Sequence, residues 1–129
     1  MSSFTAPLRL EYLDGRKWKV LEPFEYHVGE EGSGEVIAVP AGFITDFASV
    51  PRFFWRVLPP TGPYGKGAVI HDFLYSGQPP SYDRARADAI FLEAMAVVGV
   101  NWLTRYTMYA AVRVGGGAVW NHRARALKA

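Results

Sequence analysis

The chain has 129 residues and no cysteine, half of its residues are hydrophobic, and its formal net charge is +2. This length favours one globular domain over residues 1–129, and the lack of cysteine excludes disulfides, thiolate metal sites and cysteine nucleophiles. The sequence shows no secretory signal and no apolar run of the roughly 18 residues needed to span a bilayer, and the small net charge gives no reason to expect nucleic acid.

Residues 1–45 are mainly predicted as strands. The stretch PLRLEYLDGRKWKVLEPFEYHV alternates apolar and polar residues and is rich in aromatic and branched side chains, which is typical of half-buried strands. Its Asp-Gly pair is a strong hairpin signal, so we expect KWKVLEPFEYHV to return as the partner strand, with an edge or a break at Pro23. A third strand is expected in EVIAVP, and GFITDFASVP leaves the sheet as a loop or a short strand.

Residues 64–116 are mainly predicted as helices, the first of them in GAVIHDFLYSG. The second is expected in YDRARADAIFLEAMAVVGV, with Ser81 as its N-cap and Gly99 at its end. Its apolar stripe is predicted to contain Ala87, Ile90, Phe91, Ala94, Met95 and Val98. The third is expected in NWLTRYTMYAAVRVGG, and its buried side is predicted to contain Trp102, Tyr106, Tyr109 and either Val112 or Ala110.

Strands followed by helices predict an α+β fold, with a small N-terminal antiparallel β-sheet and a three-helix C-terminal part. Residues 117–129 form a basic C-terminal tail that we expect to be solvated. Its Arg123, Arg125 and Lys128 also suit contact with a phosphate or an acidic partner. The near-neutral net charge argues against DNA or RNA, so we expect no nucleic-acid partner.

The first predicted helix contains a histidine beside an aspartate inside an apolar run. Residues three or four apart share a helix face, so His71 is expected near Tyr75, while Asp72 points in another direction. Asp88 borders the apolar stripe of the second helix, and short-linked helices pack as antiparallel neighbours, which is expected to bring Asp88 beside His71. Such a carboxylate fixes one imidazole tautomer, and the other ring nitrogen then takes a proton from water or a hydroxyl.

A second group of oxygen atoms is suited to a cation. Asp72 would be free to bind one, and Asp46 lies in TDFASVP, a predicted loop with free backbone carbonyls. Carboxylate and carbonyl oxygens are the ligands that calcium prefers. Zinc is not indicated, because there is no thiol and the three histidines lack ligand spacing.

Each of these residues also has a purely structural interpretation. A His-Asp pair in a helix is usually structural, and Asp46 is also a suitable N-cap or turn residue. Asp88 also suits a helix pair with Arg84, and Tyr75 is also suited to the core with its hydroxyl at the rim. The segment RFFWRVLPP suits core cover as well as a docking surface, whose partner-binding residues would be Phe53, Phe54 and Trp55.

The strings GFITDFASVPRFFW, HDFLY and RARADAIFLEAM together resemble an uncharacterised domain family that is common in phages and prophages. The resemblance covers roughly residues 42–113 and implies a phage or prophage context near tail genes, without implying an activity. In that context we expect the protein in the host cytoplasm or the virion. Its partners would be phage structural proteins or a lipid membrane surface.

A more distant resemblance is to phospholipase A2, in particular to its small bacterial forms. The family pattern His-Asp-x-x-Tyr is matched here by His71, Asp72 and Tyr75. The resemblance implies that the histidine activates water, that its neighbouring aspartate binds the catalytic calcium, and that the tyrosine helps to hold a carboxylate that orients the histidine. That carboxylate is matched by Asp88, because RARADAIF resembles its context in the family.

The bacterial forms also have a Thr/Ser-Asp-x-x-Ser loop, which TDFASVP resembles, and this implies that Asp46 and the backbone carbonyl of Phe47 bind calcium. The chain departs from that family in lacking disulfides and a secretory signal, and in having an N-terminal sheet. The leading prediction is therefore a phage-type protein with a calcium-dependent lipid esterase site. The alternative is a non-enzymatic virion or tail-associated protein, in which the same residues form a buried structural network. The oligomeric state is not indicated.

Overall fold

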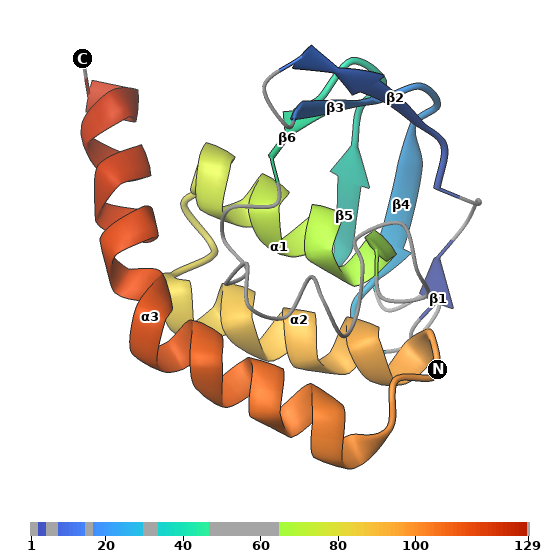
Figure 1. Ribbon diagram of the computed structural model, residues 1–129, viewed down its shortest axis with the longest axis vertical. Helices are drawn as coiled ribbons and strands as arrows, with labels where there is room; N and C mark the ends of the chain where they lie inside the picture. The colour runs from blue at the N-terminus through green and yellow to red at the C-terminus, as the bar shows by residue number, and fades with distance from the viewer. Residues whose placement is uncertain (1–2, 5–7, 15–16, 30–33, 47–64, 129) are drawn as a thin grey trace. The chain divides into compact units, whose positions relative to one another are not determined.

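The computed structural model describes residues 3–4, 8–14, 17–29, 34–46 and 65–128 (Figure 1). The chain divides into two compact units, Met1–Asp46 and Phe47–Ala129, which we call the strand unit and the helical unit. The order of strands first and helices second confirms the predicted α+β class. The prediction that residues 1–129 make up a single domain stays a prediction.

The strand unit contains two three-stranded sheets, in which every strand pair is antiparallel. One sheet has the order β1-β4-β5 and the other β2-β3-β6. The predicted hairpin is confirmed, because β2 and β3 pair with Leu10 opposite Val20 and Leu13 opposite Lys17. The strands are β1 (Ser3–Phe4), β2 (Leu10–Leu13), β3 (Lys17–Val20), β4 (Phe24–His27), β5 (Val36–Val39) and β6 (Ile44–Thr45).

The predicted return strand has the expected break at Pro23, but only its first part, β3, pairs with β2. The segment KWKVLEPFEYHV is divided between β3 and β4, which belong to different sheets. The break falls before Phe24 and contains Pro23, which has no N–H to donate to a ladder. In β4 the side chains alternate, with Phe24 and Tyr26 buried and Glu25 exposed, so the sheet of β4 has one buried face.

The helical unit contains α1 (Gly65–Gly77), α2 (Arg84–Val97) and α3 (Trp102–Lys128). The N-cap of α2 is Asp83 and not the predicted Ser81, since the Asp83 side chain accepts a 2.7 Å hydrogen bond from the backbone N–H of Arg86. Gly99 follows the end of α2 with a φ of +89°, as its prediction as the stop requires. Of the six residues predicted in the α2 stripe, all except the half-buried Val98 are buried.

The predicted buried side of α3 was right for Val112 and wrong for Trp102 and Tyr106. Trp102 is 66% exposed and Tyr106 is 51% exposed, whereas Met108, Val112 and Gly116 are buried. Aromatic residues at helical spacing usually mark a core face, but here the smaller side chains and a glycine face α1 and α2. Close approach of the helices therefore decided which side of α3 is buried.

Residues 117–128 belong to α3, which continues as a helix to Lys128, and most of them are exposed, as the predicted solvated tail requires. Figure 1 shows that α3 changes direction along its length, so that its first part follows α2 and its last part turns towards α1. The glycines at 115–117 lie between these parts, and Arg84 Nη1 donates to the carbonyls of Val112 (3.1 Å) and Arg113 (3.2 Å) just before them. Glycines and inserted side chains are ordinary causes of such bends.

Beyond the bend, α3 lies against α1. The rings of Tyr75 and Trp120 meet edge to face at 5.0 Å, and Gln78 Nε2 donates to the Trp120 carbonyl at 2.8 Å. Among the helices that the structure describes, none is long and apolar enough to cross a membrane.

Candidate functional site

His71 lies on α1 and is completely buried. Its Nε2 atom is 2.6 Å from Oδ1 of Asp88 on α2, so the contact expected from helix periodicity and antiparallel packing is present. The imidazole lies between two rings, that of Tyr75 at 4.3 Å and that of Phe91 at 4.6 Å. These neighbours restrict the ring to one orientation.

Asp88 is the centre of the site, because side chains from all three helices converge on its carboxylate. Oδ1 accepts a second hydrogen bond, from the Tyr75 hydroxyl at 2.7 Å. Oδ2 accepts from Arg113 Nη1 of α3 at 2.8 Å, and Arg84 Nη1 lies 3.6 Å from the same oxygen. A completely buried carboxylate needs several partners of this kind to remain charged.

The pKa values agree with an ionised Asp88 at neutral pH. Burial alone would raise the pKa of Asp88, but its interactions with His71, Tyr75 and Arg113 together outweigh burial and hold the pKa below its usual value. Burial and the bond to Asp88 raise the pKa of Tyr75 well above its usual value, so Tyr75 remains a neutral donor. Since Asp88 accepts, we assign the imidazole proton to Nε2, which makes Nδ1 the basic nitrogen of His71.

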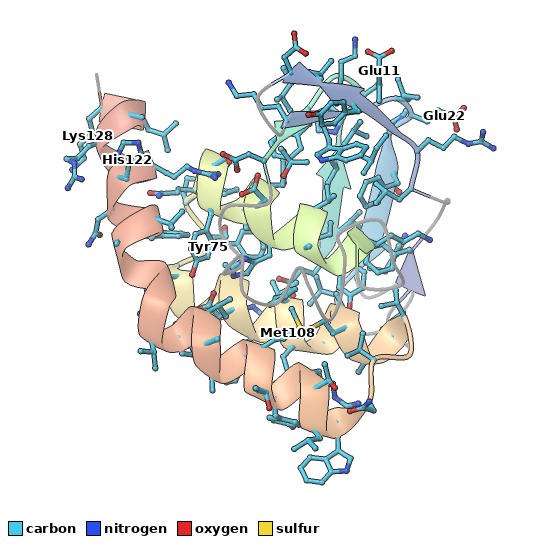
Figure 2. The ribbon with its side chains drawn as sticks, viewed as in Figure 1. Glu11, Glu22, Tyr75, Met108, His122 and Lys128 are labelled. Carbon is cyan, nitrogen blue, oxygen red and sulfur yellow. The ribbon has the colours of Figure 1, made fainter. Side chains whose placement is uncertain are left out.

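Gly116 allows α3 to approach this site closely. A Cβ atom at this position would lie 2.5 Å from the Tyr75 hydroxyl oxygen and 3.4 Å from Arg84 Nη1. Figure 2 shows the Tyr75 side chain in the space between α1 and α3. Only a residue without a side chain leaves room for the hydroxyl that bonds Asp88.

Asp72, the neighbour of His71 in the chain, is directed to a different part of α3, as the helix geometry predicts. It is only 1% exposed, and its Oδ1 accepts a 2.9 Å hydrogen bond from Arg123 Nη2. The same guanidinium also donates to the Ser76 hydroxyl, one turn further along α1. A residue predicted to belong to a solvated tail therefore neutralises the aspartate that was predicted to bind calcium.

In the part of the chain that the structure describes, the predicted calcium ligands are divided between the two units, since Asp72 lies in the helical unit. Asp46 belongs to the strand unit, and Phe47 lies outside the described residues, as do the predicted docking residues Phe53, Phe54 and Trp55. Over that part of the chain, no group of three or more histidine, aspartate or glutamate side chains is placed to hold a metal ion. Calcium binding therefore stays a prediction.

Two features of the site were missed from the sequence. The first is Arg113, for which the sequence predicted no role in the site, and the second is the close approach at Gly116. Arg113 lies in the last turn of the predicted third helix, and Gly116 lies at its predicted end. The sequence signal was the run of glycines itself, which permits close packing as well as helix termination.

The fold and the site define an α+β protein with a buried His–Asp pair that a tyrosine and two arginines support. Residues 18–112 match the model of a family described as "Protein of unknown function (DUF1353)", and the chain therefore belongs to that family. The matched region includes His71, Tyr75 and Asp88 and ends directly before Arg113. No curated protein and no solved structure matches the chain.

Proposed function

We propose that this protein is an ester hydrolase of the phospholipase A2-like type, with His71 as its general base. The observation that carries the proposal is the 2.6 Å contact between His71 Nε2 and Asp88 Oδ1, to which the Tyr75 hydroxyl also donates. This is the arrangement that the His-Asp-x-x-Tyr resemblance implies. A phage or prophage context, and a lipid as the ester, rest on the two sequence resemblances.

In the proposed reaction, His71 Nδ1 takes a proton from a water molecule as the water oxygen attacks the ester carbonyl carbon. Asp88 stabilises the imidazolium that forms, because its carboxylate is held in place by Tyr75 and Arg113. The ester C–O bond then breaks, and the imidazolium returns the proton to the leaving alcohol. Since His71 is completely buried, substrate binding must uncover its ring.

The described residues do not by themselves fit a calcium ion. Asp72 is paired with Arg123, and the described cluster already holds three guanidinium groups against two carboxylates. A divalent cation would add to this surplus of positive charge. We therefore derive the reaction without calcium. A calcium ion on Asp72 and Asp46 remains a prediction, and it requires Arg123 to leave Asp72.

The test compares His71→Gln with His122→Gln, since His122 is an exposed histidine on α3 and provides a matched control. Fatty-acid release is measured from phosphatidylglycerol vesicles and from p-nitrophenyl butyrate, with calcium and with a chelator. We expect the wild type and His122→Gln to hydrolyse ester, and His71→Gln to lose at least about a hundredfold in rate. Thermal unfolding must show that His71→Gln is folded. A wild type without activity, or a folded His71→Gln of unchanged activity, contradicts the proposal.

A second candidate function is a non-enzymatic virion or tail-associated role, in which this network holds the helices together. The complete burial of both His71 and Asp88 favours it, because a closed polar network specifies packing without any contact with substrate. In that case His71→Gln lowers the stability of the fold and no ester is hydrolysed. Co-purification of the tagged chain with defined tail or baseplate proteins would then identify the partner and its location in the virion or the host cytoplasm.

A further inference from the structure

The first part of α3 has an apolar outward side, which is unusual for a surface helix. Val114 is 89% exposed, and Trp102 at the start of the helix also lies in solvent. Between residues 103 and 118, all of which the structure describes, no charged residue lies on this side. The outer face of α3 is the apolar row of Leu103, Tyr106, Ala110, Val114 and Ala118, which repeats at three- and four-residue intervals, and the exposed Thr107 lies beside it.

The cations of this part of the helix are used elsewhere. Arg113 Nη1 bonds to buried Asp88, and Arg105 Nη1 donates to the Val100 carbonyl at 3.0 Å. The buried side of the helix is provided by Met108 and Val112, which lie opposite the outer face. Figure 1 shows α2 along one side of this part of α3, and the outer face is exposed, so it has no partner among the described residues of the helical unit.

The outer face is bulky at one end and flat at the other. Leu103 and Tyr106 lie in its first two turns, whereas Ala110 is at its middle and Ala118 at its far end. If two such faces pack antiparallel about an axis at Ala110, Tyr106 of one copy meets Val114 of the other. Leu103 then meets the flat surface at Ala118. The face is therefore complementary to itself in size, and alanine at the centre permits close approach of the two helices.

We propose that the outer face of α3 binds a second copy of this chain, forming an antiparallel two-fold dimer. The charges favour this direction, because α3 contains no acidic residue and its exposed cations Arg125 and Lys128 lie at one end. An antiparallel pair keeps these two basic ends apart, whereas a parallel pair brings them together. Neither copy has to desolvate a charge along the contact.

The size of the face indicates a weak dimer. Its large side chains are Leu103, Tyr106 and Val114, which are 65%, 51% and 89% exposed, so two copies would bury an area near the lower limit of about 1,200 Å² for a specific interface. We therefore expect a dissociation constant on the order of micromolar. The dimer does not depend on the proposed hydrolysis, since His71, Tyr75 and Asp88 lie on other helices.

Sedimentation equilibrium of the full chain over about a hundredfold range of concentration tests the proposal. We expect the wild type to pass from monomer to dimer, and Val114→Glu to remain a monomer. The matched control is Ala126→Glu, which places the same charge at an exposed position of α3 beyond the bend and leaves the dimer intact. A wild type that is a monomer throughout, or a Val114→Glu variant that still dimerises, overturns the proposal.

Engineered cysteines test the direction of packing, because the chain has no native thiol. Ala110→Cys lies on the axis and should form an intermolecular disulfide under mild oxidation. Leu103→Cys should not, since a rise of 1.5 Å per residue separates the two copies of position 103 by about 21 Å. Crosslinking of Leu103→Cys as efficient as that of Ala110→Cys rejects the antiparallel dimer. So does a monomer that binds anionic vesicles through Val114, which would make the face a membrane surface.

Discussion

The two buried aspartates of the helical unit are held in different ways. Asp88 accepts hydrogen bonds from a histidine, a tyrosine and an arginine, and a second arginine lies beside it. Asp72, one turn of α1 away from Tyr75, is paired with Arg123, which also bonds Ser76. The partners of Asp88 orient an imidazole, whereas the pair of Asp72 fastens the end of α3 to α1. Only the Asp88 cluster has the composition of a proton-transfer site.

Removing the Asp88 carboxylate should have the largest effect. Asp88→Ala leaves His71, Tyr75 and Arg113 without their shared acceptor inside the unit. We expect a loss of about 3–5 kcal/mol in the free energy of unfolding, because one partner of a buried charge pair is removed. Urea unfolding measures it. Asp88→Asn, which keeps the shape of the side chain, should lose less. A loss below about 1 kcal/mol for Asp88→Ala would show that the cluster contributes little.

Arg123→Gln tests the Asp72 cluster in the same way and should have a smaller effect. Asp72 is paired with Arg123, whose side chain is 17% exposed, so water can replace part of the hydrogen bonding that the substitution removes. We expect about 1–3 kcal/mol of destabilisation. The control is Arg125→Gln, whose side chain is exposed and whose effect should be near zero.

The same variant sharpens the question of calcium. With Arg123 absent, Asp72 loses its positive partner, so a cation should bind more tightly than in the wild type. Calorimetry with calcium, on the wild type, Arg123→Gln and Arg123→Gln combined with Asp72→Ala, separates the possibilities. Binding that appears in the single variant and disappears in the double variant assigns the cation to Asp72. Equal binding in all three places calcium elsewhere.

Alanine substitutions at two adjacent glycines separate the effect of close packing against the Asp88 cluster from the effect of helix propensity on stability. At Gly116 a new Cβ would lie 2.5 Å from the Tyr75 hydroxyl oxygen, whereas at Gly115 it meets nothing within 4 Å. Overpacking costs about 1–3 kcal/mol, and alanine returns up to about 1 kcal/mol of helix propensity. Gly116→Ala should therefore be destabilising and Gly115→Ala slightly stabilising in thermal unfolding. Equal effects would show that Tyr75 is not tightly packed against α3.

The sequence predicted the contact at the centre of the site but not its surroundings. His71, Tyr75 and Asp88 were placed by helix periodicity and by the short link between two helices, which are local rules. The contact of Arg113 depends on how α3 packs against α2, and that of Arg123 on whether α3 continues beyond three consecutive glycines, which usually favour an end. The glycines instead allow the helix to follow α2 and then α1, which is decided by packing and not by local propensity.

In the strand unit, too, local sequence rules predicted the elements but not their packing. Pro23 correctly indicated a break, because proline removes a ladder donor, but no local signal assigns the next strand to a different sheet. On α3, Trp102 and Tyr106 were predicted to be buried because large aromatic residues usually are. Their exposure is what revealed the outer face, so the failure of this prediction is itself informative.

Acid titration should give the smallest change in the free energy of unfolding, because burial and hydrogen bonding shift the pKa of Asp88 in opposite directions. The net pKa in the folded state is below the usual value, so the stabilising contribution is present above about pH 4 and is lost as pH falls through the folded-state pKa. The wild type should therefore lose its advantage over Asp88→Asn in this range, as measured by urea unfolding at each pH. Parallel curves for the two proteins would mean that the folded and unfolded pKa values of Asp88 are equal. The hydrogen bonds from His71 and Tyr75 would then only offset the cost of burying the carboxylate.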